Sequence, residues 1–321
     1  MNVSVAICTW NRGALLAQTL EQMTRLSIPV GVEWEVAVVN NNCTDATDRV
    51  IADFESRLPL KRLFEPTPGH SHARNRAIRE VTGDVILWTD DDVLVDRNWL
   101  AEYVLACRAH PDVAYFAGPV EPWFEAKPPR WMRRHLRELL GVIVCVDNGP
   151  ELRAMKPGEG LFGANMAVRR DIAAKFLFNE RLGRVQDVLT GGDDTDFVCR
   201  LADAGYGGVW VPQARVQHFV PRSRVTRSYV KRWFRDAGRT AIRQAPLAEG
   251  PSLVGVPRWV LREYLQELAK ACFWRPTGNA RWFRSYRKAL MLSGAILETR
   301  SSRSRGEAVR PAPRNSISPS S

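Results

Sequence analysis

The first hundred residues alternate between short apolar runs and longer segments in which apolar residues recur every three or four positions. The apolar runs are rich in β-branched residues and predict buried strands, as in "VSVAICTW", "WEVAVVNNN" and "GDVILWTDDD". Helical spacing characterises the segments between them, such as "ALLAQTLEQMTRL" and "GHSHARNRAIREV". Strands that alternate with helices of this length predict βαβ units, and therefore an α/β fold with a mixed, mostly parallel sheet flanked by helices.

Polar side chains follow three of the predicted strands at the point where each strand ends. They are Thr9–Arg12, Asn40–Asn42 and Asp90–Asp92. In a parallel sheet, ligands bind outside the carboxyl ends of the strands. The three polar groups are therefore predicted to form one site.

The middle of the chain, from Gly118 to Phe178, is richer in Pro, Trp and Gly. Within it, "EPWFEAKPPRWMRR" is predicted to be an irregular segment that leads into a short helix. Further on, "GGDDTDFVCRLADAG" predicts a glycine turn that opens a helix, and "GGVWVPQARVQHF" predicts a strand.

From about residue 224 the pattern is helical, with three apolar faces and many Arg and Lys residues opposite them. Beyond about Ser301 the chain is mainly Ser, Arg and Pro, which predicts disorder. The sequence thus predicts an α/β domain over residues 1–223, a basic amphipathic helical extension over 224–300 and a disordered tail over 301–321.

Charge is distributed unevenly along the chain. From Arg215 onward there are 22 Lys and Arg against 6 Asp and Glu, a net charge of +16. The whole chain carries +11, so the preceding residues carry −5. This asymmetry indicates that the C-terminal part meets something anionic, such as a membrane surface, a phosphorylated substrate or nucleic acid.

The six cysteines form no CxxC pair, and several lie within apolar runs, so they are predicted to be reduced and buried. No secretory signal is visible, and no uncharged apolar stretch approaches the roughly 18–20 residues of a membrane span. We therefore expect a cytoplasmic protein, and the sequence leaves open a peripheral association with the inner face of the membrane.

Two acidic clusters are the candidates for chemistry. Three aspartates at the end of a strand, Asp90–Asp92, are costly unless a cation meets them, and carboxylate oxygens suit Mg²⁺ or Mn²⁺. Because side chains alternate along an extended segment, Asp90 and Asp92 should point one way and Asp91 the other. The alternative is a solvated turn that leads into a helix.

The second cluster, Asp193, Asp194 and Asp196, follows two glycines and opens a helix. Acidic residues are favoured at a helix N-terminus by its dipole, but a carboxylate there can also act as a general base. His218 ends an apolar strand, where a histidine is either structural or a ligand.

The ordered set of motifs from Val3 to Gly238 resembles the family 2 inverting glycosyltransferases, which have the GT-A fold, a Rossmann-like nucleotide-diphospho-sugar transferase fold. "VAICTWNR" resembles the first-strand motif of that family. The resemblance implies that Thr9, Asn11 and Arg12 hold the base and ribose of the donor nucleotide.

Three further segments extend the resemblance to the rest of the donor. "VAVVNNNCTD" is similar to the second-strand motif, in which an Asp accepts a hydrogen bond from the base; Asn40 stands there in this chain, and an amide oxygen can also accept. "GHSHARNRAI" resembles the segment in which an Arg-Asn pair lies near the donor phosphates, which implies roles for Arg74 and Asn75. "GANMAVRR" is similar to the segment lining the donor sugar, including Asn165.

"WTDDDV" resembles the DxD motif of these enzymes. The resemblance implies that Asp92 ligates a Mn²⁺ or Mg²⁺ ion bridging the donor diphosphate, while Asp90 and Asp91 contact the ribose or the surroundings of the metal. His218 matches a histidine that often completes metal or diphosphate binding in the family.

"GGDDTDF" is similar to the family's Glu-Asp pair before a helix. Asp194 occupies the position of the catalytic base, and Asp193 stands in the position of the Glu on the acceptor side. The resemblance implies transfer of a sugar from a nucleotide-diphospho-sugar to an acceptor hydroxyl, with inversion, in the synthesis of a cell-surface or extracellular polysaccharide or glycoconjugate.

The basic C-terminal helices can be interpreted in two ways. They are either ordinary solvated faces or an in-plane attachment to anionic lipid, which would suit a lipid-linked acceptor. The segment Tyr229–Trp233 lacks the Gln of the Gln-x-x-Arg-Trp motif of processive synthases. We expect no nucleic-acid partner, because no recognition module is visible.

Two other functions remain as alternatives at this point. A sugar nucleotidyltransferase would share the fold, but the first loop, "TWNRGAL", lacks the glycine-rich pattern usual in those enzymes. A non-catalytic protein that binds anionic lipid would use the basic helices but would not need two acidic clusters.

Overall fold

The computed structural model describes residues 1–156, 159–183, 189, 191–244, 247, 250–277 and 280–304. The chain divides into two compact units. The first contains most of the chain up to Arg224, and the second contains Pro129–Glu138 and the chain from Val225 onward.

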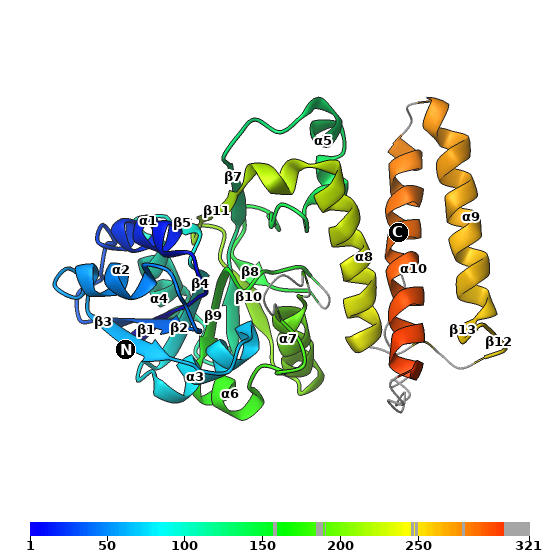
Figure 1. Ribbon diagram of the computed structural model, residues 1–321. Helices are drawn as coiled ribbons and strands as arrows, with labels where there is room; N and C mark the ends of the chain where they lie inside the picture. Colours follow the sequence, from blue (N-terminus) through cyan, green and yellow to red (C-terminus); the bar gives the residue numbers. More distant parts are fainter. Residues whose placement is uncertain are drawn as a thin grey trace. The chain divides into compact units, whose positions relative to one another are not determined.

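The first unit is built on an eight-stranded sheet (Figure 1). In spatial order its strands are β3 (Leu60–Phe64), β2 (Glu33–Asn40), β1 (Asn2–Thr9), β4 (Val85–Asp90), β9 (Asn165–Arg169), β6 (Tyr115–Ala117), β10 (Gly208–Trp210) and β8 (Arg153–Ala154). The first four strands are parallel, and β9 runs antiparallel to both β4 and β6. The predicted mixed, mostly parallel sheet is confirmed.

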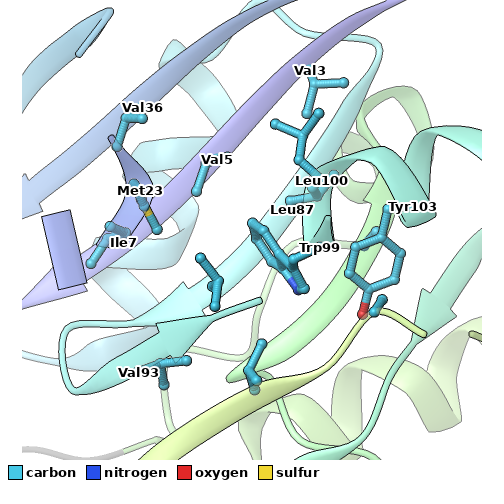
Figure 2. Packing of buried hydrophobic residues seen from close by; sticks show 14 of the residues in the cluster. Val3, Val5, Ile7, Met23, Val36, Leu87, Val93, Trp99, Leu100 and Tyr103 are labelled. Atoms are coloured by element: carbon cyan, nitrogen blue, oxygen red, sulfur yellow. The ribbon is translucent and has the colours of Figure 1, made fainter. Parts of the chain in front are cut away.

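Helices cover both faces of this sheet. One face packs against α1 (Gly13–Met23), α2 (Thr47–Phe54) and α4 (Trp99–Ala109), and the other against α3 (His70–Glu80), α6 (Arg170–Phe176) and α7 (Asp193–Asp203). Strand alternation divides the core: in β1, Val5 and Ile7 face the α1 side, and Ala6 faces the α3 side. Figure 2 shows the first core, in which Trp99 and Tyr103 of α4 lie near Leu87 of β4.

A second, three-stranded sheet has the order β5 (Val93–Val95), β11 (Val216–Val220) and β7 (Val120–Phe124). Strand β11 pairs antiparallel with β5, which places His218 opposite Val93. The amide of Phe219 also donates to the carbonyl of Asp92 at 2.9 Å. This pairing brings a histidine from late in the chain to the end of β4.

The sequence-based prediction was wrong in this region. The segment predicted to be irregular contains β7 before the short helix α5 (Arg130–Arg134), and the strand predicted around residues 207–219 is two strands, β10 and β11. Strand β7 contains Pro122, which lowers its strand propensity but is tolerated because β7 is an edge strand.

The second unit is helical, as the sequence predicts. It includes α5, α8 (Arg227–Gln244), α9 (Arg258–Trp274), α10 (Ala280–Ser304) and a hairpin of β12 (Ser252–Leu253) and β13 (Val256–Pro257). Short 3₁₀ turns occur at η1 (Leu136–Leu139), η2 (Arg222–Val225) and η3 (Arg275–Thr277). Helix α10 lies between α8 and α9 (Figure 1).

Glycines and one buried carboxylate hold α8 against α10. A Cβ at Gly238 would collide with the carbonyl of Met291, and one at Gly294 with the carbonyl of Arg235, so the two backbones approach closely. The Glu298 carboxylate is buried and accepts hydrogen bonds of 2.9 Å from Arg239 and Arg243. These arginines hold the pKa of Glu298 below its usual range, to about 2, against the effect of burial.

Helix α10 continues to Ser304, so the first residues of the tail predicted to be disordered are helical. The rest of that predicted tail, residues 305–321, lies outside the described residues. In the part of the chain that the structure describes, no helix is both long and apolar enough to cross a bilayer.

All six cysteines are free. Cys107 is buried, and Cys8, Cys43 and Cys145 are half-buried. The prediction that the cysteines are buried is wrong for Cys199 and Cys272, which are exposed on helical surfaces of α7 and α9.

Asn165 connects several elements of the first unit from within the core. Its Oδ1 accepts hydrogen bonds from Trp99 Nε1 at 2.7 Å and from the Tyr103 hydroxyl at 2.8 Å. Its Nδ2 donates to the carbonyls of Pro119 and Ala214 at 2.8 and 2.7 Å. The side chain is fully buried, so these four bonds account for the hydrogen-bonding capacity of the amide.

We therefore expect Asn165→Leu to lower the free energy of unfolding by at least about 3 kcal/mol, because two buried donors and two carbonyls lose their partner. Urea unfolding followed by fluorescence measures the change, with the exposed Asn2→Leu as control. Unchanged stability accompanied by loss of donor-sugar binding would contradict this structural role and favour direct contact with the sugar.

Candidate active site

The aspartate triplet (Asp90–Asp92) lies at the carboxyl end of β4: Asp90 is the last residue of the strand, and Asp91 and Asp92 form the turn that follows. Asp91 Oδ2 accepts a hydrogen bond from the Thr9 hydroxyl at 2.8 Å, and the Asp91 carbonyl accepts one from Thr19 at 3.1 Å. Asp90 and Asp92 instead approach His218. Asp90 and Asp92 therefore share the side of His218, as predicted, but Asp92 also reaches Arg12 together with Asp91.

Asp90, Asp92 and His218 form a group that could hold a cation. His218 Nε2 lies 3.4 Å from Asp92 Oδ1 and 3.9 Å from Asp90 Oδ2, and the three atoms all lie within 4.8 Å of one another. Ligands of a Mg²⁺ ion lie about 2.1 Å from it, so neighbouring ligand atoms about 3–4 Å apart fit one ion. His218 Nδ1 lies 2.9 Å from the carbonyl of Phe219, an arrangement that orients Nε2 toward the carboxylates.

Arg12 neutralises the side of the triplet that faces β1. Its Nη1 lies 3.1 Å from Asp91 Oδ1 and 2.8 Å from Asp92 Oδ2. One carboxylate oxygen of Asp92, Oδ2, therefore faces Arg12, and the other, Oδ1, faces His218. Burial raises the pKa of Asp91 to about 6 despite Arg12, with the charge of Asp92 adding to the rise, and the same carboxylates raise the pKa of Arg12.

The loops after β1 and β2 are fixed by amide side chains. Asn11 has a left-handed backbone with φ of 52°, and its Oδ1 accepts a hydrogen bond from the Thr44 amide at 2.7 Å. Asn40 is buried; its Oδ1 accepts a hydrogen bond from the Cys43 amide at 2.8 Å, and its Nδ2 donates to Asp48 at 2.7 Å. One lone pair of the Asn40 oxygen is thus used within the loop.

The second acidic group, the aspartate pair (Asp193 and Asp194), opens α7 after Gly192, whose φ is 92°. Asp193 is buried, and its Oδ2 lies 3.0 Å from Arg74 Nη1 and 3.2 Å from His70 Nδ1. Burial alone would raise the pKa of Asp193, but Arg74 and His70 outweigh it and hold that pKa well below its usual range. Asp193 is therefore ionised at neutral pH.

The pKa of Asp194 is shifted in the opposite direction to that of Asp193. Its Oδ2 accepts a hydrogen bond from the Gly163 amide at 2.9 Å, and its Oδ1 one from the Thr195 amide at 2.8 Å. Burial, and then the adjacent charge of Asp193, raise the pKa of Asp194. Neighbouring carboxylates whose pKa values are pushed apart are typical of an acid–base site.

Gly163 serves both members of the aspartate pair. Its amide holds Asp194, and a Cβ at this position would collide with the guanidinium of Arg74, which holds Asp193. Arg74 also lies over the rings of Phe178 and Trp88, at 4.8 and 5.7 Å from their centroids. These contacts and the ion pair with Asp193 fix the direction of this buried cation.

The two acidic groups share one electrostatic environment at the sheet edge. The pKa of Arg74 is raised by Asp193, by Asp194 and also by Asp90, against the effect of burial. The predicted grouping of the ends of β1, β2 and β4 is present, since Thr9 and Arg12 contact Asp91 and Asn11 bonds the loop after β2 at Thr44. Asn75 has a different position: its side chain bonds both the amide and the carbonyl of Phe178, at 2.7 and 2.9 Å, within the core.

Three residues that hold the site together were given no individual role by the sequence, although Asn41 belongs to one of the predicted polar groups. His70 shares Asp193 with Arg74, and its spacing of i, i+4 from Arg74 on α3 was the available signal. Asn41 bonds the carbonyls of Glu65 and Thr67 and the amide of Gly69, which fixes the loop before α3. Gly163 and Asn41 act through backbone contacts that no sequence pattern reveals.

Comparison with known proteins identifies the family and the fold. The model of "Glycosyl transferase family 2" matches residues 4–173. The succinoglycan biosynthesis protein ExoM of Rhizobium meliloti (strain 1021) is 29% identical over 244 residues, which cover 74% of this chain and 73% of that protein. Validoxylamine A glucosyltransferase of Streptomyces hygroscopicus subsp. jinggangensis is 33% identical over 111 residues, or 34% of this chain and 26% of that enzyme.

Two solved structures share the fold. A mannosyltransferase of Pyrobaculum calidifontis, in complex with GDP-Man and Mn²⁺, has a TM-score of 0.62 at 20% identity and covers 92% of this chain and 86% of its own. Residues 1–349 of S. aureus TarS, in complex with UDP-GlcNAc, have a TM-score of 0.52 at 13% identity, with coverage of 97% and 93%. This chain belongs to glycosyl transferase family 2 and is a glycosyltransferase with the GT-A fold.

Proposed function

We propose that this glycosyltransferase is metal-dependent and inverting, and that it moves a sugar from a nucleotide-diphospho-sugar to an acceptor hydroxyl. The observation that carries the proposal is the division of labour between the acidic groups. Asp90 and Asp92 face a histidine, as cation ligands do, whereas the pKa of Asp194 is raised by burial and by the charge of the adjacent Asp193.

The donor side would be formed by the ends of β1 and β4. Asp92, Asp90 and His218 would hold Mn²⁺ or Mg²⁺, which, when bound, neutralises charge on the departing nucleoside diphosphate. Thr9 and Arg12 hold Asp91 in place, and the exposed part of Arg12 would contact the nucleotide together with Asn11 and Asn40. Arg74 belongs to the same proposed donor side, whereas the side chain of Asn75, expected there from the sequence, is bonded to Phe178 in the core.

Asp194 would act as the general base. Its two backbone hydrogen bonds fix the carboxylate, and its raised pKa favours acceptance of a proton from the acceptor hydroxyl. The acceptor oxygen then forms a bond to the anomeric carbon as the bond from that carbon to the diphosphate oxygen breaks on the opposite side. A single displacement of this kind inverts the configuration, with Asp193 lying on the acceptor side.

The class of product follows from the relatives. The ExoM relative is named for succinoglycan biosynthesis, and the two solved neighbours are complexes with GDP-Man and with UDP-GlcNAc. These names support a nucleotide-diphospho-sugar donor and a role in cell-surface or extracellular polysaccharide or glycoconjugate synthesis. We further propose a lipid-linked acceptor, and hence a peripheral position at the inner face of the membrane.

We expect Asp92→Asn to weaken Mn²⁺ binding roughly 100-fold or more, and His218→Asn to weaken it by about 10–100-fold, because each removes a ligand or the orientation of one. Titration of free Mn²⁺ by electron paramagnetic resonance, in the presence of a nucleoside diphosphate, measures both. The exposed Asp96→Asn is the control. Equal Mn²⁺ affinity in Asp92→Asn and the wild type would exclude this cation site.

We expect Asp194→Asn to lower the rate of transfer about 10²–10⁴-fold while donor affinity stays unchanged, because only the proton acceptor is lost. Mn²⁺-dependent release of nucleoside diphosphate from a panel of nucleotide sugars measures the rate, and calorimetry measures donor binding. The control Asp196→Asn removes a carboxylate from the same helical turn that pairs with Arg200. Transfer that survives in Asp194→Asn would show that the base lies elsewhere.

The pH profile provides an independent test of the aspartate pair. A base must be deprotonated, so kcat/KM should rise with pH through the pKa of Asp194, above the value of about 3.9 for an ordinary aspartate. Asp193→Asn removes a charge that raises this pKa, so the acid limb should move to lower pH. A limb that stays in place in Asp193→Asn would contradict the assignment, and Asp196→Asn again serves as control.

A further inference from the structure

The outer face of α9 carries exposed apolar and basic side chains on one stripe. We call this stripe the α9 outer face; its members are Arg258, Trp259, Arg262, Leu265, Gln266, Ala269 and Phe273, of which only Gln266 is neither apolar nor basic. Steps of three or four residues from Trp259 onward keep these side chains on one side of the helix. Leu265 and Phe273 are 61% and 70% exposed. Among the described residues, α10 is the main helical neighbour of α9 (Figure 1), and the stripe is a large exposed apolar surface.

The opposite side of α9 accounts for its contacts with the rest of the second unit. Val260, Glu267 and Ala271 are buried. Among the described residues, burying this side against α10 leaves Leu265 and Phe273 mostly exposed, although Phe273 also contacts the ring of Trp274 in the same helix. The packing of α9 on α10 therefore does not account for these exposed apolar side chains.

The β12–β13 hairpin just before α9 has exposed apolar side chains at its tip. Its two-residue turn consists of Val254 and Gly255, both with left-handed backbones, at φ of 48° and 79°. Glycine and asparagine favour this conformation, whereas a β-branched valine is strained in it. Leu253 and Val254 are 54% and 67% exposed. A strained and exposed valine at a turn that asparagine would suit better points to a function outside folding.

The charged side chains of α9 indicate which kind of surface its outer face can bind. The two acidic residues of α9 lie off the outer face, where Glu263 pairs with Lys288 at 2.7 Å and Glu267 with Lys270 at 2.8 Å. The outer face itself carries Arg258 and Arg262, and all residues of α9 are described. An apolar stripe with arginines and no acid on it repels a second copy of itself and complements an anionic, partly apolar surface.

We propose that the α9 outer face and the tip of the β12–β13 hairpin dock the protein in the plane of an anionic phospholipid surface. Trp259, Leu265 and Phe273 enter the boundary between headgroups and acyl chains, and the arginines contact the lipid phosphates. The inference deepens the proposed function, since it rests on that function for the lipid-linked nature of the acceptor.

Sedimentation with vesicles tests the docking surface in the full chain. Wild-type protein should bind vesicles of equal parts phosphatidylcholine and phosphatidylglycerol, should bind phosphatidylcholine alone much more weakly, and should dissociate as salt rises. Arg262→Gln should lower the partition coefficient roughly fivefold, as expected for one basic residue at the surface. The double variant R262Q/L265Q should lower it further.

The chain offers a matched control for this double variant. Leu105 and Arg108 are also an exposed leucine and arginine three residues apart, on α4, and Leu105 is 57% exposed. L105Q/R108Q should bind vesicles like the wild type. If it weakens binding as much as R262Q/L265Q does, net charge and hydrophobicity act without a specific face, and the proposal is overturned.

The variant Val254→Asn distinguishes an effect on vesicle binding from an effect on folding. It should raise the melting temperature, because asparagine tolerates the left-handed backbone, and at the same time weaken vesicle binding. Unchanged binding by both Val254→Asn and R262Q/L265Q would overturn the proposal. So would a wild-type dimer that R262Q/L265Q converts to monomer, because a second copy would then cover the face.

Release of nucleoside diphosphate in the absence of vesicles distinguishes the two proposals. The docking variants should keep this basal rate, because none of them lies in the candidate active site. Wild-type protein that binds anionic vesicles but releases no nucleoside diphosphate from any donor would contradict the proposed function and leave the docking surface standing.

Discussion

The candidate active site depends on one electrostatic constraint. Several carboxylates are held, largely out of water, at one edge of the eight-stranded sheet. Like charges in such a place repel, and burial adds a desolvation cost. Two arginines offset this, Arg12 at the aspartate triplet and Arg74 at the aspartate pair. Each arginine bonds only some of the carboxylate oxygens near it, so other oxygens of the same aspartates point away from the arginine. Those directions are what make the edge usable for chemistry.

The scaffold explains how so dense a charge can be maintained. The ends of β1 and β4 are neighbours in the sheet, the small sheet brings His218 back to β4, and the turn before α7 places the aspartate pair beside α3. Asn165 ties α4 and two loops to β9 from within the core. Rigid elements on both faces thus fix side chains that would otherwise move apart.

The sequence predicts the fold class, the helical C-terminal part and the residues that converge, because continuous apolar runs, helical periodicity and ordered motifs are local signals. Family membership removes the two rival functions. The failures have physical causes. Strand β7 contains a proline that only an edge position tolerates, and exposure of Cys199 depends on which helix face packs. The buried bonds of Asn165 and Asn75 join segments far apart in sequence, so no local pattern could separate a structural amide from one that binds substrate.

Gly163 has a consequence for how such an enzyme can change. One backbone position carries the hydrogen bond to Asp194 and also leaves the space that Arg74 occupies. Any side chain introduced there would disturb Asp194, the proposed base, together with Arg74, the counter-charge of Asp193. If Asp194 activates the acceptor as proposed, that activation and the local charge balance are coupled through a single residue, and divergence toward new acceptors has to proceed through the surrounding loops while this position stays fixed.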